Sequence, residues 1–393
     1  MDRKPVSVLK TAVCILLCLA IIIGGLAALT NITQRKDSVT KYIKFFENAQ
    51  DYDILYLGTS HVINAFLPME LWGEYGMTAY NLGGHSNTMA INYWVLKNAL
   101  DYASPKLVVL DCFDISGDTR CSDTSFAHFS LDALPLSKNK VSAVYDIFSE
   151  PDLIPLRSDF LFRFSIYHTR WEELSADDFI AGDGIENGAN SRIGLAAPAP
   201  FAPTDAAAEV ASDNVGLSYF DRILAECESR GIDVLLTYLP YPAPEERWME
   251  VNYVQTLAQE RGLDYINFLK LGVIDYNTDC YDPASHLNPS GAKKVTHYLG
   301  EYIRGHYNIT DRRGESAYAH WSDDYQRYLG IKASQPLGQN DLYIWLMLLS
   351  DSYFDCCIYI APQSPLLADE TVRSLIFNLG KAQSGIDGSA LEI

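Results

Sequence analysis

The sequence predicts an α/β protein whose main domain has a flavodoxin-like, three-layer α/β/α arrangement around a parallel sheet. Two observations favour this fold class. Short apolar runs that are typical of buried strands alternate with longer segments of helical character. The first of these runs enters a glycine-containing turn, which is where α/β proteins place their chemistry. We expect one transmembrane helix before this domain and a small α/β module after it.

The N-terminal segment is predicted to be a membrane anchor. Residues 11–30 contain no charged side chain, and a helix of about twenty apolar residues spans about 30 Å of hydrocarbon. The run is longer than the apolar core of a cleavable signal peptide, although a cut near residues 26–28 remains the alternative. Basic residues in the tail, residues 1–10, favour a cytoplasmic N-terminus and an extracytoplasmic remainder.

The main domain is expected over residues 50–310, and its first half alternates strands with helices. After a helix near residues 38–48, the predicted elements are a strand at 53–57, a helix at 68–75, a strand at 78–81, a helix at 88–102 and a strand at 106–111. This rhythm predicts a parallel sheet with helices on both faces, because parallel strands need crossover connections.

The alternation of predicted strands and helices is then interrupted, and it resumes later in the chain. Residues 116–215 show few periodic runs and are predicted to be an insertion over one end of the sheet. The elements that follow are a helix at 216–230, a strand at 233–239, a helix at 245–261, a strand at 264–268, a loop at 279–289 and a helix at 290–305.

The C-terminal region is expected to form two parts. Residues 311–335 are polar and aromatic and are predicted to be a linker, whereas residues 336–393 are predicted to be a small accessory α/β module. The module's predicted elements are helices at 342–349 and 367–379 and a strand at 355–360. The sequence assigns no chemistry to this module.

Composition excludes some partners. The formal net charge is −20 and the isoelectric point is near 4.7, so the surface would repel the phosphates of a nucleic acid. No cysteine or histidine spacing typical of a metal site occurs. We therefore expect no nucleic-acid partner, no metal and no cofactor.

Ser60 is the candidate nucleophile. It follows the predicted strand through Gly58, and it would begin the next helix, whose N–H groups stabilise developing negative charge. Serine catalysis also needs a histidine to accept the hydroxyl proton and donors for the oxyanion. A serine after a strand more often only caps a helix, so the tripeptide alone is weak evidence.

Three motifs together resemble blocks I, II and V of the SGNH (GDSL-like) hydrolase superfamily. They are Gly58-Thr59-Ser60-His61, Asn81-Leu82-Gly83-Gly84, and His286-Leu287-Asn288 with the nearby Asp282. The resemblance covers about residues 51–305, the insertion excepted. The first motif is most similar to membrane-anchored envelope members, such as D-alanyl-transfer proteins of teichoic acid synthesis and polysaccharide O-acetyltransferases.

The resemblance implies roles for particular residues. Ser60 would be the nucleophile, His286 the general base and Asp282 its orienting carboxylate. The amides of Ser60 and of Gly83 or Gly84 would stabilise the oxyanion. Apart from the resemblance, His61 and His85 are candidates for lining the substrate site, and the alternative for His61 is a packing or capping role.

The implied function is that of an extracytoplasmic serine esterase or O-acyltransferase at the cell membrane. Its substrates would be cell-envelope glycans or teichoic acid, and its implied partner is a membrane-bound O-acyltransferase. Transfer and hydrolysis stay open, as do the acyl group and the acceptor.

The sequence departs from the family pattern at two positions. Three residues separate Asp282 from His286 where the family has two, so Asp279 or a backbone carbonyl could orient the histidine instead. The third block has no asparagine, since this chain has Asp111-Cys112-Phe113-Asp114 there, and losing one oxyanion donor typically costs about 10²–10³ in rate. These departures leave open a catalytically inactive scaffold or glycan-binding protein with this fold. A lipid-directed esterase is a third reading, for which the sequence shows no apolar entrance.

Overall fold

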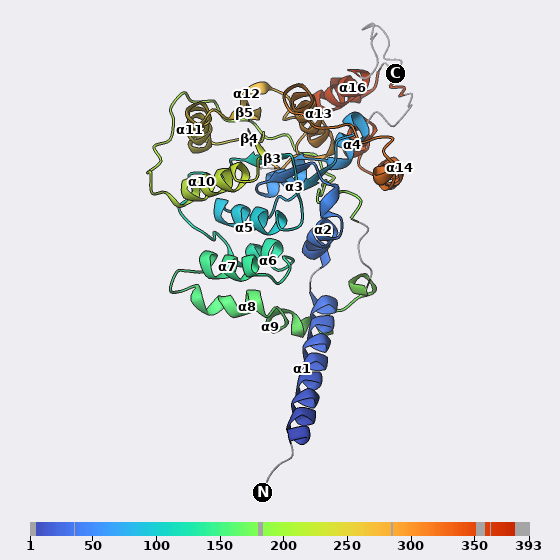
Figure 1. The fold of residues 1–393 in the computed structure, drawn as a ribbon. Coiled ribbons are helices and arrows are strands. Elements are labelled where there is room, and N and C mark those ends of the chain that lie inside the picture. Colours follow the sequence, from blue (N-terminus) through green and yellow to red (C-terminus); the bar gives the residue numbers. More distant parts are fainter. Residues whose placement is uncertain are drawn as a thin grey trace.

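The computed structural model describes residues 5–34, 36–179, 184–283, 286–350, 358–361 and 363–381. Within them lies one five-stranded parallel sheet with the order β2-β1-β3-β4-β5, and Figure 1 shows this sheet among the helices that surround it. Its strands are β1 (Ile54–Leu57), β2 (Ala79–Asn81), β3 (Leu107–Asp111), β4 (Asp233–Tyr238) and β5 (Asp264–Asn267). All five lie within or next to the predicted strands, so the expected α/β class with a parallel sheet is confirmed.

The strands read as continuous apolar runs because both faces of the sheet are buried. In β1 the side chains of Leu55 and Leu57 belong to one buried cluster, whereas those of Ile54 and Tyr56 belong to another. Successive side chains of a strand point to opposite faces, which explains this alternation.

Helices contribute the remaining parts of these two clusters. Residues of α3 (Ser60–Ala65) and α13 (Pro289–His306) join the cluster of Ile54 and Tyr56. Residues of α5 (Met89–Ala99), α10 (Val215–Glu228) and α11 (Glu245–Arg261) join the other, and α4 (Pro68–Tyr75) contributes to both. The short α12 (Phe268–Leu271) follows β5 directly.

The predicted insertion contains several short helices. They are α6 (Thr124–Leu131), α7 (Lys138–Ile147), α8 (Arg157–Leu161) and α9 (Phe164–Tyr167), with 3₁₀ turns between some of them. Most are too short to give a clear helical period in the sequence. Aromatic contacts link them, as where His128 stacks on Phe160 at 3.9 Å between ring centroids.

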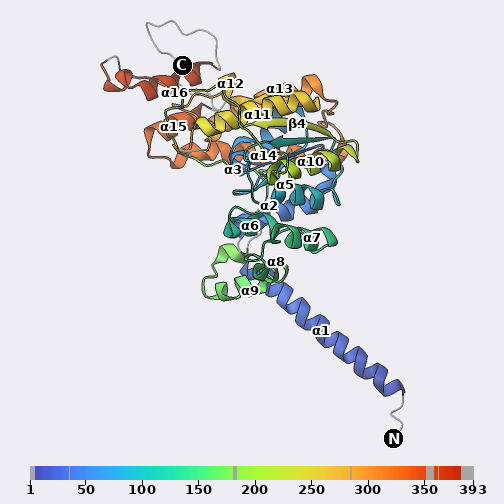
Figure 2. The same cartoon turned by 90° about the vertical axis from the view of Figure 1, so that its left-hand side faces the viewer.

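The first helix, α1 (Pro5–Thr33), projects from the rest of the chain, as Figure 2 shows. Its segment Leu9–Thr33 is long and apolar enough to cross a membrane, which agrees with the predicted anchor. Near its C-terminal end it meets the insertion, since Arg163 donates a hydrogen bond of 2.7 Å to the side chain of Gln34. The helix α2 (Lys36–Glu47) leads from there to the sheet domain.

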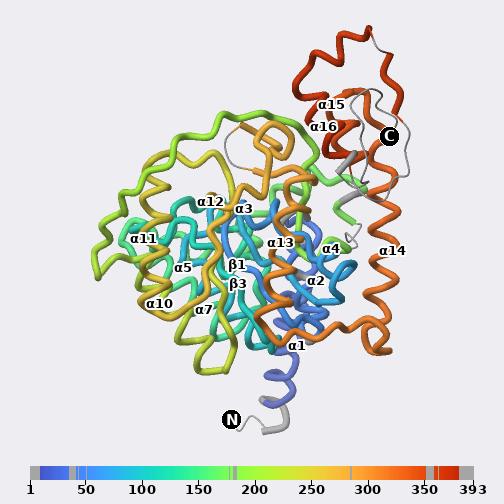
Figure 3. The backbone as a smooth tube through the Cα atoms, turned by 90° about the horizontal axis from the view of Figure 1, so that it is seen from above, coloured from blue at the N-terminus to red at the C-terminus, as the bar shows by residue number. Residues whose placement is uncertain are grey.

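The predicted linker at 311–335 is instead largely helical. It contains α14 (Ala319–Ser334), which lies beside α4 (Figure 3). Trp321 is buried with its ring 5.3 Å from that of Trp72, and the hydroxyl of Tyr328 donates to Glu70 at 2.8 Å. Aromatic residues in this segment are therefore buried against the sheet domain.

The described part of the C-terminal module consists of helices and 3₁₀ turns. The helix α15 (Leu342–Leu349) has the predicted bounds, and α16 (Glu370–Lys381) follows a 3₁₀ turn at Pro365–Ala368. The two helices share a small hydrophobic cluster of their own. Of the strand predicted at 355–360, residues 355–357 lie outside the described residues, and residues 358–360 are not in a strand.

Candidate active site

The turn between β1 and α3 positions Ser60. Gly58 has a φ of 155°, and a Cβ at this position would lie 2.5 Å from Val62 and 2.8 Å from Asp111. Only glycine fits such a close approach. Thr59 caps α3 by accepting a hydrogen bond from the amide of His61, so Ser60 becomes the first residue of the helix.

The loop before α13 positions the histidine. Cys280 forms antiparallel bridges with Ala196 and Leu287, and the amide of Tyr281 donates to the carbonyl of His286 at 2.8 Å. The loop is fixed at its base by Asn288, whose side chain donates to the carbonyl of Thr278 at 2.8 Å. The segment from Asp282 to His286 is thus the tip of a bridged loop, and residues 284 and 285 within it lie outside the described residues.

A continuous chain of hydrogen bonds joins the three predicted residues. The Nε2 atom of His286 lies 2.9 Å from the Oγ of Ser60, and its Nδ1 lies 2.5 Å from an Oδ of Asp282. With the proton on Nδ1, the ring donates to Asp282 and accepts from the Ser60 hydroxyl. The extra residue between Asp282 and His286 therefore does not separate them.

The alternative partner Asp279 is engaged elsewhere. Its carboxylate is buried and accepts hydrogen bonds from the amide of Asp275 at 2.7 Å, from the hydroxyl of Ser290 at 2.9 Å and from Lys294 at 2.7 Å. These bonds hold the start of the loop against α13. Asp279 is thus a structural residue of the loop, and Asp282 holds the ring.

The three side chains are open to solvent. His286 is 20% exposed and Asp282 is 25% exposed, and Ser60 is also partly exposed. A nucleophile that a substrate must reach needs such access, whereas a buried structural network would not have it.

The expected oxyanion donors of the second block are occupied within the fold. The amide of Gly83 donates to the side-chain oxygen of Asn81 at 3.1 Å, and the amide of Gly84 donates to the carbonyl of Gly58 at 3.0 Å. Both amides thus have acceptors in this structure, and a role for Gly83 or Gly84 as an oxyanion donor stays a prediction. The amide of Ser60, first in α3, donates to no acceptor in the described residues.

The two glycines instead allow close packing around the nucleophile turn. A Cβ on Gly83 would lie 2.9 Å from the carbonyl oxygen of Thr59, and one on Gly84 would lie 2.2 Å from the hydroxyl of Ser130. Gly83 thus lets the β2 turn pack against the Ser60 turn, and Gly84 lets it pack against α6.

Asp111 occupies the start of the third block, beneath the Ser60 turn. One carboxylate oxygen accepts from the amide of Leu239 at 3.0 Å, and the other is buried with no hydrogen-bond partner among the described residues. Burial raises the pKa of Asp111 to about 7. An ionised carboxylate cannot donate to an oxyanion, so Asp111 does not replace the missing asparagine in that form.

His61 lies in an aromatic setting next to the nucleophile. Its ring stacks on Tyr241 at 4.8 Å and meets Phe113 edge-on at 4.6 Å, and it lies 5.8 Å from the ring of His286. Burial, and then the nearby charge of His286, lower the pKa of His61 to about 3. His61 is therefore a neutral imidazole beside Ser60, and its contact with a substrate stays a prediction.

His85 and a residue that the sequence analysis missed line a cavity of about 290 Å³ beside the β2 turn. The missed residue is Lys41 of α2, whose ammonium donates to the carbonyl of Gly83 and, at 3.3 Å, to Asn81. Burial lowers the pKa of Lys41 well below its usual value. No local pattern marks this lysine, because its contact joins segments about forty residues apart.

This arrangement has the parts of a covalent acyl-transfer site. A serine hydroxyl that donates to an imidazole, itself held by a carboxylate, can attack an acyl carbon. Among the described residues no group of three or more metal-ligating side chains occurs. A scan against family models, a search of curated proteins and a search of solved structures each returned no match to this chain.

Proposed function

We propose that the chain is a serine esterase or O-acyltransferase that works through an acyl-enzyme on Ser60. The observation that carries this proposal is the hydrogen-bonded chain from Ser60 through His286 to Asp282, with distances of 2.9 and 2.5 Å. Ser60 and His286 are 226 positions apart in the chain and meet at the end of a parallel strand, where α/β proteins bind substrates.

The reaction would proceed in two steps. The Oγ of Ser60 attacks the acyl carbon while the Nε2 of His286 takes the hydroxyl proton, and that proton then goes to the departing alcohol. In the second step His286 takes a proton from water or an acceptor hydroxyl, which attacks the acyl-enzyme, and His286 returns that proton to the Oγ of Ser60 as the ester bond to Ser60 breaks. Asp282 keeps the ring oriented and stabilises its charged form.

The resemblance to the SGNH superfamily, with its flavodoxin-like three-layer fold, is part of this proposal. The strand order 2-1-3-4-5 is the order of flavodoxin-like sheets. Buried clusters on both faces of the sheet are also those that such a fold requires. The departure is the oxyanion site, where the amide of Ser60 is the donor that the described structure leaves available.

The proposed location is the outer side of the cell membrane, with α1 as a single-pass anchor. Basic residues before the apolar segment favour a cytoplasmic N-terminus. Envelope glycans or teichoic acid would then be within reach as substrates. A membrane-bound O-acyltransferase that supplies acyl groups is the proposed partner.

A fluorophosphonate probe tests the proposal because it labels activated serines. The full chain should be labelled, and Ser60→Ala should abolish both labelling and the release of acid from p-nitrophenyl acetate. Melting temperatures within a few degrees would show that the variant is folded. Equal labelling of the wild type and the variant would remove Ser60 from the mechanism.

An inactive scaffold is the second candidate, and the occupied amides of Gly83 and Gly84 favour it. Without these donors the site has less stabilisation for an oxyanion, and each donor is worth about 10²–10³ in rate. A wild-type chain that is folded but never labelled would support the scaffold over the enzyme.

A further inference from the structure

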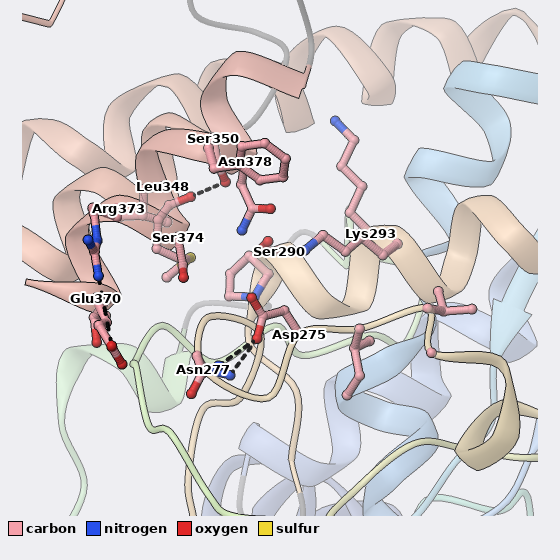
Figure 4. Close-up of a pocket in the computed structure, with 18 of the residues that line it drawn as sticks. Asp275, Asn277, Ser290, Lys293, Leu348, Ser350, Glu370, Arg373, Ser374 and Asn378 are labelled. Carbon is pink, nitrogen blue, oxygen red and sulfur yellow. Dashed lines mark hydrogen bonds and ion pairs between the residues drawn. The ribbon is translucent and has the colours of Figure 1, made fainter. Parts of the chain in front are cut away.

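A cavity of about 890 Å³ separates the C-terminal module from the loop that carries His286. Figure 4 shows labelled side chains around it from the loop before α13, from the first turns of α13 and from α16. The end of α14 also contributes to its wall through Lys332 and Gln335. Its volume is in the range of ligand-binding clefts.

Cationic side chains outnumber acidic ones in this lining. The cations are Lys293, Lys294, Lys332 and Arg373, and the acids are Asp275 and Glu370. This local excess occurs in a chain whose net charge is −20. An anionic ligand is therefore favoured here, although the surface as a whole would repel one.

The lysines of α13 are partly neutralised by carboxylates that lie outside the lining. Lys294 donates to Asp279 at 2.7 Å, and Lys293 lies 3.8 Å from Glu70. On α16, Arg373 lies 3.8 Å from Glu370, and both side chains are exposed. These three cations are thus weaker anchors for a ligand than an unpaired cation would be.

Lys332 differs from them. Its side chain is only 4% exposed, and its ammonium lies 5.4 Å from the ring centroid of Tyr328. Within the described ranges it forms no ion pair and no side-chain hydrogen bond. A buried ammonium without a counter-ion is costly, so an anionic group in the cavity would stabilise it.

The rest of the lining suits a ligand that is rich in hydroxyl groups. Neutral donors and acceptors are contributed by Asn277, Ser290, Ser374 and Asn378, among others. Phe377 also lines the cavity and is 56% exposed, which leaves an apolar ring for the carbon face of a sugar or polyol.

The cavity is joined to the candidate active site through the loop. The side chain of Asn378 on α16 donates to the hydroxyl of Thr278 at 3.1 Å, and the carbonyl of Thr278 accepts from Asn288. The helix α13, whose first turn lines the cavity, begins three residues after His286. A ligand held here would lie along the segment that positions the catalytic base.

We propose that this cavity binds a segment of an anionic, hydroxyl-rich polymer, with Lys332 as the counter-ion of its phosphate or carboxylate group. The polymer is the acyl acceptor, an assignment that rests on the function proposed above. The C-terminal module is then a substrate-binding element that closes one wall of the acceptor site.

Calorimetry on the full chain in detergent tests this proposal, with Ser60→Ala as the background so that no turnover occurs. The probes are a glycerol phosphate oligomer, a galacturonate oligomer, a neutral dextran oligomer and inorganic phosphate. One of the two polyanions should bind at least about tenfold more tightly than dextran and inorganic phosphate. The better of the two identifies the anionic group.

Variants of the buried lysine provide the second measurement. Lys332→Met should raise the Kd of the polyanion by about tenfold or more, whereas Lys332→Arg should keep it within about threefold. The matched control is Lys138→Met, an exposed lysine outside the cavity, which should bind as the background does. Melting temperatures would show that each variant is folded.

Three results would overturn the proposal: no binding of either polyanion, unchanged binding in Lys332→Met, or equal affinity for inorganic phosphate and the oligomers. Labelling of Ser60 in the wild-type chain is measured separately. Binding of a polyanion without labelling of Ser60 would overturn the proposed enzymatic function but not the proposed ligand site. Labelling without binding would overturn the ligand site but not the enzymatic function.

Discussion

At the scale of single residues, one imidazole ring organises the candidate site. His286 lies between the hydroxyl of Ser60 and the carboxylate of Asp282, and it comes from a loop far from Ser60 in the chain. The environments of the two neighbouring histidines differ. Neighbouring His61 is buried among aromatic rings and is neutral, whereas His286 is partly exposed.

His286 and Asp282 should differ in their importance for catalysis. His286→Ala removes the group that accepts the Ser60 proton, and we expect activity towards p-nitrophenyl acetate to be abolished. Asp282→Ala removes only the orienting carboxylate, so kcat should fall by up to about 10⁴ and remain above that of His286→Ala. Steady-state kinetics of both variants measure this. A loss in Asp282→Ala as complete as that in His286→Ala would contradict it.

His61 should not titrate in the range where catalysis is measured. Burial lowers its pKa to about 3, so it stays neutral at pH 5 and above. The rising limb of kcat/KM between pH 5 and 8 should therefore contain no ionisation of His61. His61→Gln should leave the position of that limb unchanged, even if kcat itself falls. A second ionisation in the wild type that disappears in His61→Gln would contradict the prediction.

At the scale of elements, short connections and helices position the site. The sharp turn at Gly58 presents Ser60 on α3, and the bridged loop before α13 presents His286. The elements added to the sheet domain are packed against it rather than loosely attached, as α14 and the insertion helices show.

The helix α14 should contribute to the stability of the sheet domain. Trp321 is buried against Trp72 and Tyr52, and truncating a buried tryptophan to alanine costs about 3–5 kcal/mol. Denaturant unfolding should show a loss of this size in Trp321→Ala. Trp171→Ala is the matched control, because Trp171 is 66% exposed and should change stability by less than about 0.5 kcal/mol. If Trp321→Ala were as stable as Trp171→Ala, α14 would not contribute to the stability of the sheet domain.

The insertion helix α7 should make stability depend on pH through Lys140. Burial lowers the pKa of Lys140 from 10.5 to about 7, and its ammonium donates to the carbonyl of Leu131. Between these two values the unfolded chain binds a proton that the folded chain does not, so this group makes the free energy of unfolding rise with pH. Its destabilising effect is greatest below pH 7.

Lys140→Met removes this titration. The stability of the variant relative to the wild type should be highest below pH 7 and should decrease as the pH rises towards 10. Urea unfolding at pH 6, 8 and 10 measures the difference. A difference that is constant over this range would show that Lys140 keeps its ordinary pKa in the folded protein.

At the scale of the whole molecule, α2 connects the apolar helix α1 to the sheet domain, and the insertion packs against the end of α1. Side chains of the insertion contact the end of α1, where Arg163 bonds to Gln34 and Arg170 donates to the carbonyl of Thr33. The opposite end of the chain forms the module that borders the 890 Å³ cavity. The insertion is thus the part of the domain next to the apolar helix (Figures 1 and 2).

The proposed topology predicts where the domain lies. Because basic residues precede the apolar segment, a reporter enzyme fused after Gly305 should be active outside the cytoplasm. The measurement is a pair of fusions at this site, one to a reporter active only outside and one to a reporter active only inside. Activity of the cytoplasmic reporter would overturn the envelope assignment.

Local patterns in the sequence determined the elements. The runs that form β1 and β3, the helix bounds of α4, α11 and α15, and the long apolar α1 follow from residue types over a few turns or strand positions. The sequence also identified Ser60, His286 and Asp282 as candidates, because each lies in a short motif that resembles one of the SGNH superfamily.

Only the tertiary structure decided how these parts meet. Whether Asp282 or Asp279 holds His286 depends on loop geometry that spacing alone does not fix. The occupied amides of Gly83 and Gly84, the reach of Lys41 and the packing of α14 are all contacts between distant segments. Such contacts depend on how segments pack in three dimensions, and a single sequence records periodicity along the chain but not proximity across the fold.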